Sequence, residues 1–249
     1  MVNKTVLITG ASSGIGKSIA LYLANHDYKV FGTSRTPENV NISKLEILRM
    51  DVTEPESIKS TIDKLGKIDI LINNAGIGIA GAVEDIPEQD IKKQFEVNFF
   101  GTDRLCREAI PKMRKQQNQS YIINIGSLAG EFALPFQAYY SASKFALKGY
   151  TLALRSELKP FNVIPVLIEP GDFKTAFTNN RKIIEGKNDS DYTTRLKKAL
   201  KAQTKAENEV ADPIKLAQLV YKIINKANPK PVYYVGPSSF MARLKKWLP

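Results

Sequence analysis

Tyr140 and Lys144 are the residues whose types and spacing most directly suggest chemistry. A spacing of four places both side chains on one face of a helix, within reach of each other. A free tyrosine hydroxyl titrates near pH ~10, and a nearby ammonium group lowers its pKa by stabilising the phenolate. The pair therefore indicates a group that gives and takes a proton near neutral pH. An exposed helix pair worth ~0.2–0.5 kcal/mol is the alternative that the spacing alone leaves open.

A glycine-rich turn near the start of the chain indicates phosphate binding. Residues 5–9 have the apolar pattern of a buried strand, and residues 17–24 carry apolar side chains at helical spacing. Between them, Gly10 permits a tight turn, while Gly14 and Gly16 lack the Cβ atoms that would keep a pyrophosphate from the helix amides. The GxxxGxG spacing varies the usual GxGxxG fingerprint, so we predict dinucleotide binding, with a plain glycine turn as the alternative.

These two features belong to a set of six motifs that resembles the short-chain dehydrogenase/reductase family over nearly the whole chain. The motifs are TGASSGIG at 9–16, NNAG at 73–76, VN at 97–98, Ser127 thirteen residues before Tyr140, YSASK at 140–144 and PGDFKT at 170–175. They occur in the family's order and with its spacing. The resemblance implies an oxidoreductase that uses a nicotinamide dinucleotide.

The elements that must position these residues alternate along the chain. With 249 residues, 43% of them hydrophobic, the chain can bury a full α/β core, and we predict a single domain over 1–249. Helices are predicted between strands near 3–9, 29–34, 45–50, 68–73, 120–126, 162–168 and 231–235. This alternation predicts a doubly wound parallel sheet, a Rossmann fold of about seven strands, with the ligand at the carboxyl ends of the strands.

The end of the second predicted strand indicates which dinucleotide binds. In this architecture an Asp or Glu there would accept a hydrogen bond from the ribose 2′-hydroxyl of NAD. The chain has Ser34 instead, followed by Arg35, whose guanidinium can pair with a 2′-phosphate. We therefore predict NADP(H) rather than NAD(H), although Ser13 occupies a position where many NADP-dependent relatives carry a second basic residue. A solvated loop charge is the alternative for Arg35.

The resemblance extends the cofactor site to further loops at strand ends. Asp51 and Val52 match the family's adenine contact, with an acid at a helix N-terminus as the alternative for Asp51. The implied cofactor contacts are Gly10, Ser12, Ser13, Gly14, Ile15, Gly16, Ser34, Arg35, Asp51, Val52, Asn74, Ala75, Gly76, Tyr140, Lys144, Pro170, Gly171, Phe173 and Thr175.

The resemblance also implies a mechanism with four catalytic residues. Ser127 would hydrogen-bond the substrate carbonyl, and Tyr140 would protonate its oxygen during reduction or remove the alcohol proton during oxidation. Lys144 would bind the nicotinamide ribose and lower the pKa of Tyr140. Asn98 would interrupt its helix and hold a water that connects Lys144 to solvent, with an ordinary helix asparagine as the alternative.

The substrate pocket of this architecture lies after Ser127, just before Tyr140 and after the Pro-Gly turn. The chain places a largely apolar set there, namely Phe132, Leu134, Phe136, Phe173, Ala176 and Phe177. This set predicts a hydrophobic ketone, aldehyde or alcohol as substrate, although some of these rings will simply pack the core. The variable segment 172–209 follows the turn, and its charged part from 178 onward predicts a helical lid.

Cysteine and histidine content excludes several functions. Cys106 is the only cysteine, so no intrachain disulfide can form and a cytoplasmic location is the simplest expectation. His26 is the only histidine and lies near the end of the first helix, which argues against a Ser-His-Asp hydrolase and against the usual zinc sites. We predict no metal site. No apolar run approaches the ~18 residues of a membrane span.

The net charge of +11 raises the question of anionic partners. The basic residues are spread along the chain without a nucleic-acid motif, so we predict a solvated basic surface and no nucleic-acid binding. The segment 237–249 places Phe240, Leu244 and Trp247 at helical spacing with cations between them. We expect it to pack on its own subunit or a partner, with peripheral membrane contact as the alternative.

Two other functions and an assembly remain to be weighed. The same fold could serve a nonenzymatic NADPH-sensing or scaffold protein, or a reductase of carrier-bound 3-oxoacyl groups. The presence of all four catalytic residues favours an enzyme. The resemblance implies a homodimer or homotetramer formed through helices near 98–117 and 138–158. Apolar residues on these helices, which could equally pack inside the chain, are Leu105, Ala109, Phe145, Leu147 and Leu152.

Overall fold

The computed structural model describes residues 4–37, 41–116, 118–171, 173, 177, 180–186, 192–208 and 211–244, with 203–208, 241, 243 and 244 as backbone only. A seven-stranded sheet forms its centre, in the order β3-β2-β1-β4-β6-β7-β9, and every pairing in it is parallel. The strands are β1 (Thr5–Thr9), β2 (Lys29–Ser34), β3 (Leu45–Arg49), β4 (Ile70–Asn73), β6 (Ser120–Ile125), β7 (Val163–Pro170) and β9 (Val232–Val235). The predicted doubly wound sheet is confirmed, with strand ends within about two residues of those expected.

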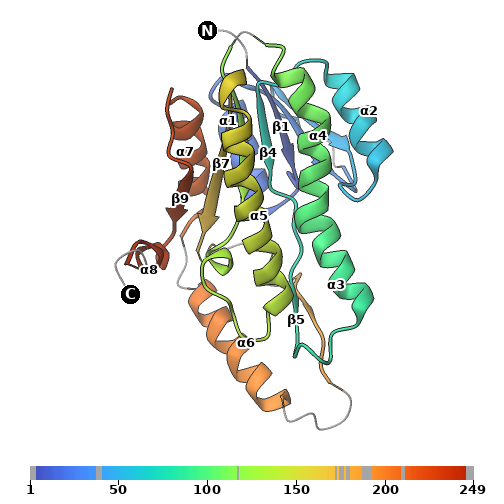
Figure 1. The fold of residues 1–249 in the computed structure, drawn as a ribbon, viewed down its shortest axis with the longest axis vertical. Helices are drawn as coiled ribbons and strands as arrows, with labels where there is room; N and C mark the ends of the chain where they lie inside the picture. The colour runs from blue at the N-terminus through green and yellow to red at the C-terminus, as the bar shows by residue number, and fades with distance from the viewer. Residues whose placement is uncertain are drawn as a thin grey trace.

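Helices cover both faces of this sheet (Figure 1). Their bounds are α1 (Gly14–Ala24), α2 (Pro55–Leu65), α3 (Glu88–Phe95), α4 (Gly101–Met113), α5 (Ala138–Glu157), α6 (Thr193–Asn208), α7 (Pro213–Ile224) and α8 (Ser239–Leu244). A π-helical turn, η1 (Glu96–Phe100), joins α3 to α4, and two short 3₁₀ turns are η2 (Leu128–Gly130) and η3 (Lys159–Phe161).

Side-chain alternation along β1 shows how the sequence builds two cores. Val6 and Ile8 pack with α1 and α7 on one face of the sheet, whereas Leu7 packs with α2 and α4 on the other. Successive side chains of a strand point to opposite faces, so a central strand covered on both sides must be apolar throughout. β4 and β6 are accordingly buried at every position.

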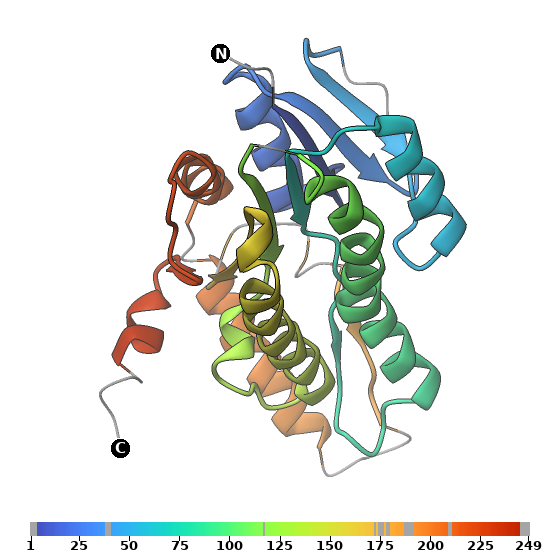
Figure 2. The same ribbon diagram turned by 45° about the horizontal axis from the view of Figure 1, so that its top comes forward.

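A second, two-stranded sheet lies beyond the carboxyl ends of the main strands. It pairs β5 (Ile79–Ala80) with β8 (Lys182–Ile183) in parallel, and α6 follows β8 (Figure 2). Lys182 Nζ donates to both carboxylate oxygens of Asp90 on α3, at 2.7 and 2.8 Å. The segment predicted as a helical lid therefore contains a paired strand as well as a helix. The sequence did not predict this strand because two residues are too short to show a periodicity.

The exposed surface bears on assembly and on the tail. Of the apolar residues considered for an interface, Leu105, Ala109 and Leu147 are buried within the chain, while Phe145 and Leu152 are 42% and 36% exposed. In the tail, Phe240 is 59% exposed, and residues 245–249 lie outside the described part. Within the portion that the structure describes, no helix combines the length and apolar character needed to cross a membrane.

Candidate active site

The glycine turn after β1 requires glycine for steric reasons that the structure makes explicit. Gly10 and Gly14 have φ angles of +66° and +54°, in the left-handed region that side chains rarely adopt. A Cβ on Gly16 would lie 2.2 Å from the carbonyl oxygen of Gly10 and 2.4 Å from Asn74 Nδ2. The backbone can therefore fold back on itself only because these three positions lack side chains.

Thr9 and Asn74 hold this turn against the next strand. Asn74 Nδ2 donates to the carbonyl oxygens of Thr9 and Gly10, at 2.9 and 3.1 Å, and Thr9 Oγ1 accepts from the backbone amides of Asn74 and Ala75. The first turn of α1 contains no acidic residue, and Ser13 at its N-cap makes no side-chain capping bond. The N-terminal residues of α1, Gly14 and Ile15, thus line the cleft, with no acidic side chain in this first turn to compete for their amides.

The ends of β2 and β3 supply the polar groups farther along the cleft. Ser34 Oγ donates to the carbonyl oxygen of Thr36, and Arg35 is exposed at the rim. Asp51 Oδ1 accepts from the amide and the hydroxyl of Thr53, at 2.9 and 2.8 Å. Asp51 therefore caps a local turn, while the N-cap residue of α2 is Glu54.

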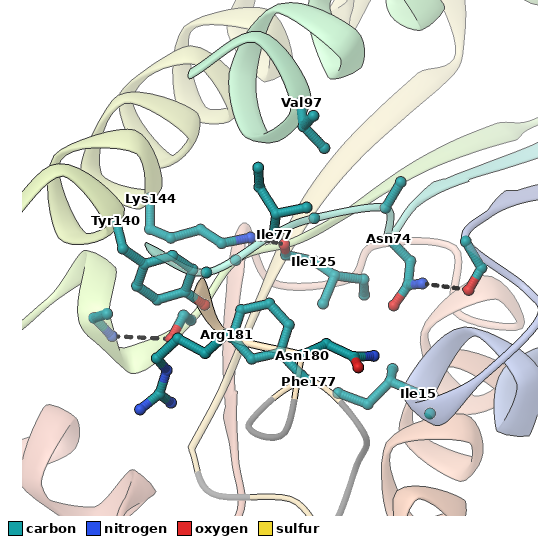
Figure 3. A pocket seen from close by; sticks show the side chains of 18 of the residues that line it. Ile15, Asn74, Ile77, Val97, Ile125, Tyr140, Lys144, Phe177, Asn180 and Arg181 are labelled. Carbon is teal, nitrogen blue, oxygen red and sulfur yellow. Dashed lines mark hydrogen bonds between the residues drawn. The ribbon is translucent and has the colours of Figure 1, made fainter. Parts of the chain in front are cut away.

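Tyr140, Lys144 and Ser127 come together at the ends of β6 and α5. Lys144 Nζ donates to the carbonyl oxygen of Ile125 at 3.0 Å and lies 5.8 Å from the centre of the Tyr140 ring. Ser127 caps η2, where its Oγ accepts from the amide of Ala129. Figure 3 shows the Tyr140 ring and the Lys144 side chain entering the same pocket from one helix.

Burial changes the acid–base behaviour of Lys144. The side chain is 6% exposed, and this burial lowers the pKa of its amine to about 8, with Glu169 opposing the effect. A buried ammonium is less stable because it has lost its hydration. The amine is therefore close to the pH range in which it could exchange a proton.

Asn98 lies in the π-helical turn η1, which interrupts the long α3–α4 helix. Its Oδ1 accepts from the amide of Ile77 at 2.8 Å, and its Nδ2 donates to the carbonyl oxygen of Ile77 and to Ser143 Oγ. Such π turns inside helices are frequent at functional sites. Here the turn fixes the loop after β4, and a Cβ on Gly76 of that loop would lie 3.9 Å from Lys144 Nζ.

A single cleft of about 1590 Å³ contains most of the predicted site. The predicted residues that line it are Gly10, Ser12, Ser13, Gly14, Ile15, Ser34, Arg35, Asp51, Val52, Asn74, Ala75, Gly76, Ser127, Phe132, Leu134, Tyr140, Lys144, Pro170, Gly171, Phe173 and Phe177. Gly16 and Asn98 lie behind the wall, where they shape it. Thr175 and Ala176 lie outside the described residues.

Phe136 is placed differently from the expectation. It does not line the cleft, and its ring faces Tyr192, with 6.3 Å between the ring centres. The φ angle of Phe136 is +61°, a local backbone reversal that no sequence period reveals. Phe177, in contrast, lies 5.7 Å from the Tyr140 ring, centre to centre.

The cleft also has walls that sequence reasoning did not single out. Gln137, which is 2% exposed, lines it one helical turn before Tyr140, a spacing that could have identified it. Further lining residues include Ile77, Gly78, Gln89, Lys92, Lys93, Asn180, Arg181, Ala202 and Ser238. These come from the loop between β4 and β5, α3, the segment around β8, α6 and the loop before α8, so only the fold brings them together.

The residues present fit a nicotinamide dinucleotide. The uncapped N-terminus of α1 and its glycine cradle suit a pyrophosphate, and the buried Lys144 beside Gly76 suits ribose hydroxyls. These features lie at the carboxyl ends of parallel strands on both sides of the β1–β4 switch point, where this architecture binds dinucleotides.

Comparison with known proteins agrees with this geometry. The family model for short chain dehydrogenases matches residues 4–185. The chain belongs to the short-chain dehydrogenase family. Among curated short-chain dehydrogenases, 3-ketodihydrosphingosine reductase of Bacteroides thetaiotaomicron is 42% identical over 257 aligned positions, which cover 100% of this chain and 94% of the relative.

Solved structures of the short-chain dehydrogenase family also match. A short-chain dehydrogenase from Streptomyces avermitilis superposes with a TM-score of 0.86 at 27% identity, covering 99% of this chain and 96% of that one. ElxO, solved with NADP bound, has a TM-score of 0.76 at 25% identity and covers 94% and 97% of the two chains. The family assignment makes the chain an oxidoreductase.

Proposed function

We propose that this protein is an NADP(H)-dependent reductase of a long-chain hydrophobic ketone, with 3-ketodihydrosphingosine as the first candidate. The observation that carries the proposal is the single cleft in which Ser127 and Tyr140 lie among Phe132, Leu134 and Phe177. Its support from relatives is the 42% identity, over nearly the whole of both chains, to a reductase of that ketone.

Each residue has a separate task in the proposed reduction. A dinucleotide bound in this cleft would supply the hydride for the carbonyl carbon. Ser127 Oγ donates a hydrogen bond to the carbonyl oxygen and holds it beside Tyr140, whose hydroxyl gives its proton to that oxygen as the alcohol forms. Lys144 orients the ribose and stabilises the resulting phenolate with its charge.

Support for NADP(H) comes from the end of β2. Ser34 occupies the position of a ribose-binding carboxylate, its hydroxyl is hydrogen-bonded to the carbonyl oxygen of Thr36, and Arg35 lines the cleft beside it. A guanidinium can form two charge-assisted hydrogen bonds with a 2′-phosphate. The NADP found in ElxO is consistent with this preference.

Cofactor preference can be tested on dissociation constants. We expect the wild-type protein to bind NADPH more tightly than NADH, and Arg35→Gln to weaken NADPH binding by about tenfold to a hundredfold while NADH binding hardly changes. Arg49→Gln removes an exposed cation on the neighbouring strand β3 that does not line the cleft, so it controls for overall charge. Equal affinities of the wild type for the two dinucleotides would refute the NADP assignment.

Substrate class can be tested by NADPH consumption. We expect turnover of 3-ketodihydrosphingosine, with kcat/KM falling as the alkyl chain of the ketone is shortened, because the pocket wall near Tyr140 is apolar. The same assay should also include a carrier-bound 3-oxoacyl substrate and a panel of aldehydes. Tight NADPH binding without turnover of any of these would favour the sensing or scaffold function instead.

We propose that two copies pair through the α4–α5 face. Phe100, Phe145 and Leu152 are 44%, 42% and 36% exposed on η1 and α5, and large apolar side chains gathered on one exposed face can mark an interface. Light scattering after size exclusion should give a dimer or tetramer that Phe145→Glu dissociates. A monomeric wild type would contradict this assembly.

A further inference from the structure

Behind the active site lies a group of ionisable side chains that the proposed reaction does not use. It consists of Glu131, Lys148, Glu169 and Tyr234, and we call it the rear cluster. Glu131 Oε1 accepts from the hydroxyl of Tyr234 at 2.5 Å and from Lys148 Nζ. Lys148 Nζ also lies 4.0 Å from Glu169 Oε2. The four side chains therefore form one connected set of charges.

Each member of the rear cluster is adjacent to an element of the active site. Glu131 comes four residues after Ser127, at the end of η2, and Lys148 comes one helical turn after Lys144 on α5. Glu169 directly precedes the Pro170 turn and pairs in register with Tyr234 of β9. The cluster thus connects the elements that carry the catalytic serine, the catalytic lysine and the turn after β7.

Glu169 is the most deeply placed member. It is 0% exposed, and neither of its carboxyl oxygens has a hydrogen-bond partner among the described residues. A Cβ on Gly130 would lie 2.9 Å from Glu169 Oε1 and 3.1 Å from the carbonyl oxygen of Lys144. The carboxyl group is therefore packed against η2 and near the turn of α5 that carries the catalytic lysine.

The charges around Glu169 have opposing effects. Burial raises the pKa of its carboxyl to about 8, Glu131 adds to the rise, and Lys148 and Lys144 oppose it. Glu131 stays ionised, because hydrogen bonds from Lys148 and Tyr234 outweigh its burial and hold its pKa below the ordinary value. Burial lowers the pKa of Lys144 to about 8, the negative charge of Glu169 opposes that shift, and Lys144 Nζ lies 5.8 Å from the centre of the Tyr140 ring. Glu169 and Lys144 therefore titrate over the same range and influence each other.

We propose that Glu169 is a positioning residue for the active site, whose carboxylate keeps the amine of Lys144 charged in mildly alkaline solution. As the pH rises, the proton of Glu169 leaves to solvent and a negative charge appears near Lys144, which retains its own proton. Glu131 delays this ionisation by repulsion. The inference rests on the proposed role of Lys144 in holding the cofactor.

NADPH affinity and kcat/KM should fall above a certain pH, which we call the alkaline limit. Two substitutions should shift this limit in opposite directions. Glu169→Gln removes the partner of Lys144, so the pH above which NADPH affinity and kcat/KM fall should decrease by about half a unit or more. Glu131→Gln removes the repulsion, so Glu169 ionises earlier and the same limit should rise. A purely structural role would weaken the protein in both variants without moving the limits apart. Limits that stay in place, or that move in the same direction, would overturn the proposal.

A measurement on the cofactor-free protein separates this inference from the proposed function. Between pH 4.5 and about 8 the folded state keeps a proton on Glu169 that the unfolded state has lost, so this group's contribution to stability falls as the pH rises. Glu169→Gln should remove this loss of stability, so the Tm of the variant relative to wild type should increase from pH 4.5 to about 8. Asp69→Asn is the matched control, because Asp69 is a buried carboxylate paired with Lys67 at the amino end of the central strand β4, the opposite end of the sheet's strands from Glu169.

Asp69→Asn should lower the Tm and leave the alkaline limit of NADPH binding unchanged. If Glu169→Gln leaves the pH dependence of Tm unchanged, Glu169 does not titrate in this range and the inference fails even for an active enzyme. If the pH dependence of Tm changes but the protein binds neither dinucleotide, the proposed function fails, and with it the role of Glu169 toward Lys144.

Discussion

The two halves of the cleft differ in the groups that form their walls. On the β1–β4 side, the wall consists of backbone groups held by Thr9 and Asn74. A Cβ on Gly16 would overlap the Gly10 carbonyl, and Gly10 and Gly14 have left-handed φ angles that favour glycine. On the β6–β7 side, the wall consists of side chains from η2, α5 and the segments near β8. Cofactor binding by the first half should be lost when a single methyl group is added. Catalysis by the second half should be lost when a functional group is removed, while the fold stays intact.

Tyr140→Phe tests the side-chain half and should have the largest effect. Loss of the hydroxyl removes the proton donor, so kcat should fall by about 10²–10⁴-fold while the dissociation constant for NADPH stays within about threefold. Stopped-flow turnover and cofactor titration measure the two quantities. Tyr139→Phe is the matched control, because the Tyr139 hydroxyl contacts only the carbonyl oxygen of Val83 at 3.5 Å among its described hydrogen bonds. Retained turnover in Tyr140→Phe would remove this residue as the acid.

Gly16→Ala tests the backbone half and should come next. The added methyl would overlap the Gly10 carbonyl at 2.2 Å, so the turn must open and NADPH affinity should fall by about tenfold or more, together with Tm. Gly149→Ala on α5 is the control, since its Cβ would meet nothing within 4 Å. That change should stabilise the helix by up to about 1 kcal/mol. Unchanged cofactor affinity in Gly16→Ala would show that the turn does not depend on glycine.

The same contrast explains what the sequence could predict. The positions of the strands and the glycine turn follow from local patterns, because periodicity and steric limits act over a few residues. Tyr140 and Lys144 were identifiable because one helical turn fixes their relation. Phe136 was placed incorrectly in the pocket because its backbone reverses locally, with a φ of +61°.

The features that the sequence did not predict depend on long-range contacts. The β5–β8 sheet joins segments about a hundred residues apart, and the pairing of Lys182 with Asp90 spans 92 positions. The rear cluster likewise assembles side chains from η2, α5, β7 and β9. Nothing in a single stretch of sequence distinguishes these residues from ordinary charged ones, so only the fold reveals them.

The smallest predicted effect concerns the attachment of β8 to α3. Lys182 binds both oxygens of Asp90, which is 5% exposed, and the neighbouring Asn180 and Arg181 line the cleft. Lys182→Gln should therefore raise the KM for the ketone by about twofold to fivefold and leave NADPH binding unchanged, since a partly exposed ion pair contributes about 0.5–1 kcal/mol.

Asp90→Asn should have a similar effect, and the double variant should be no worse than either single one, because both changes remove the same contact. Additive effects would show that the two side chains act independently. A change in NADPH affinity would show that this contact supports the cofactor half as well, and the division of the cleft into two separately built halves would then fail.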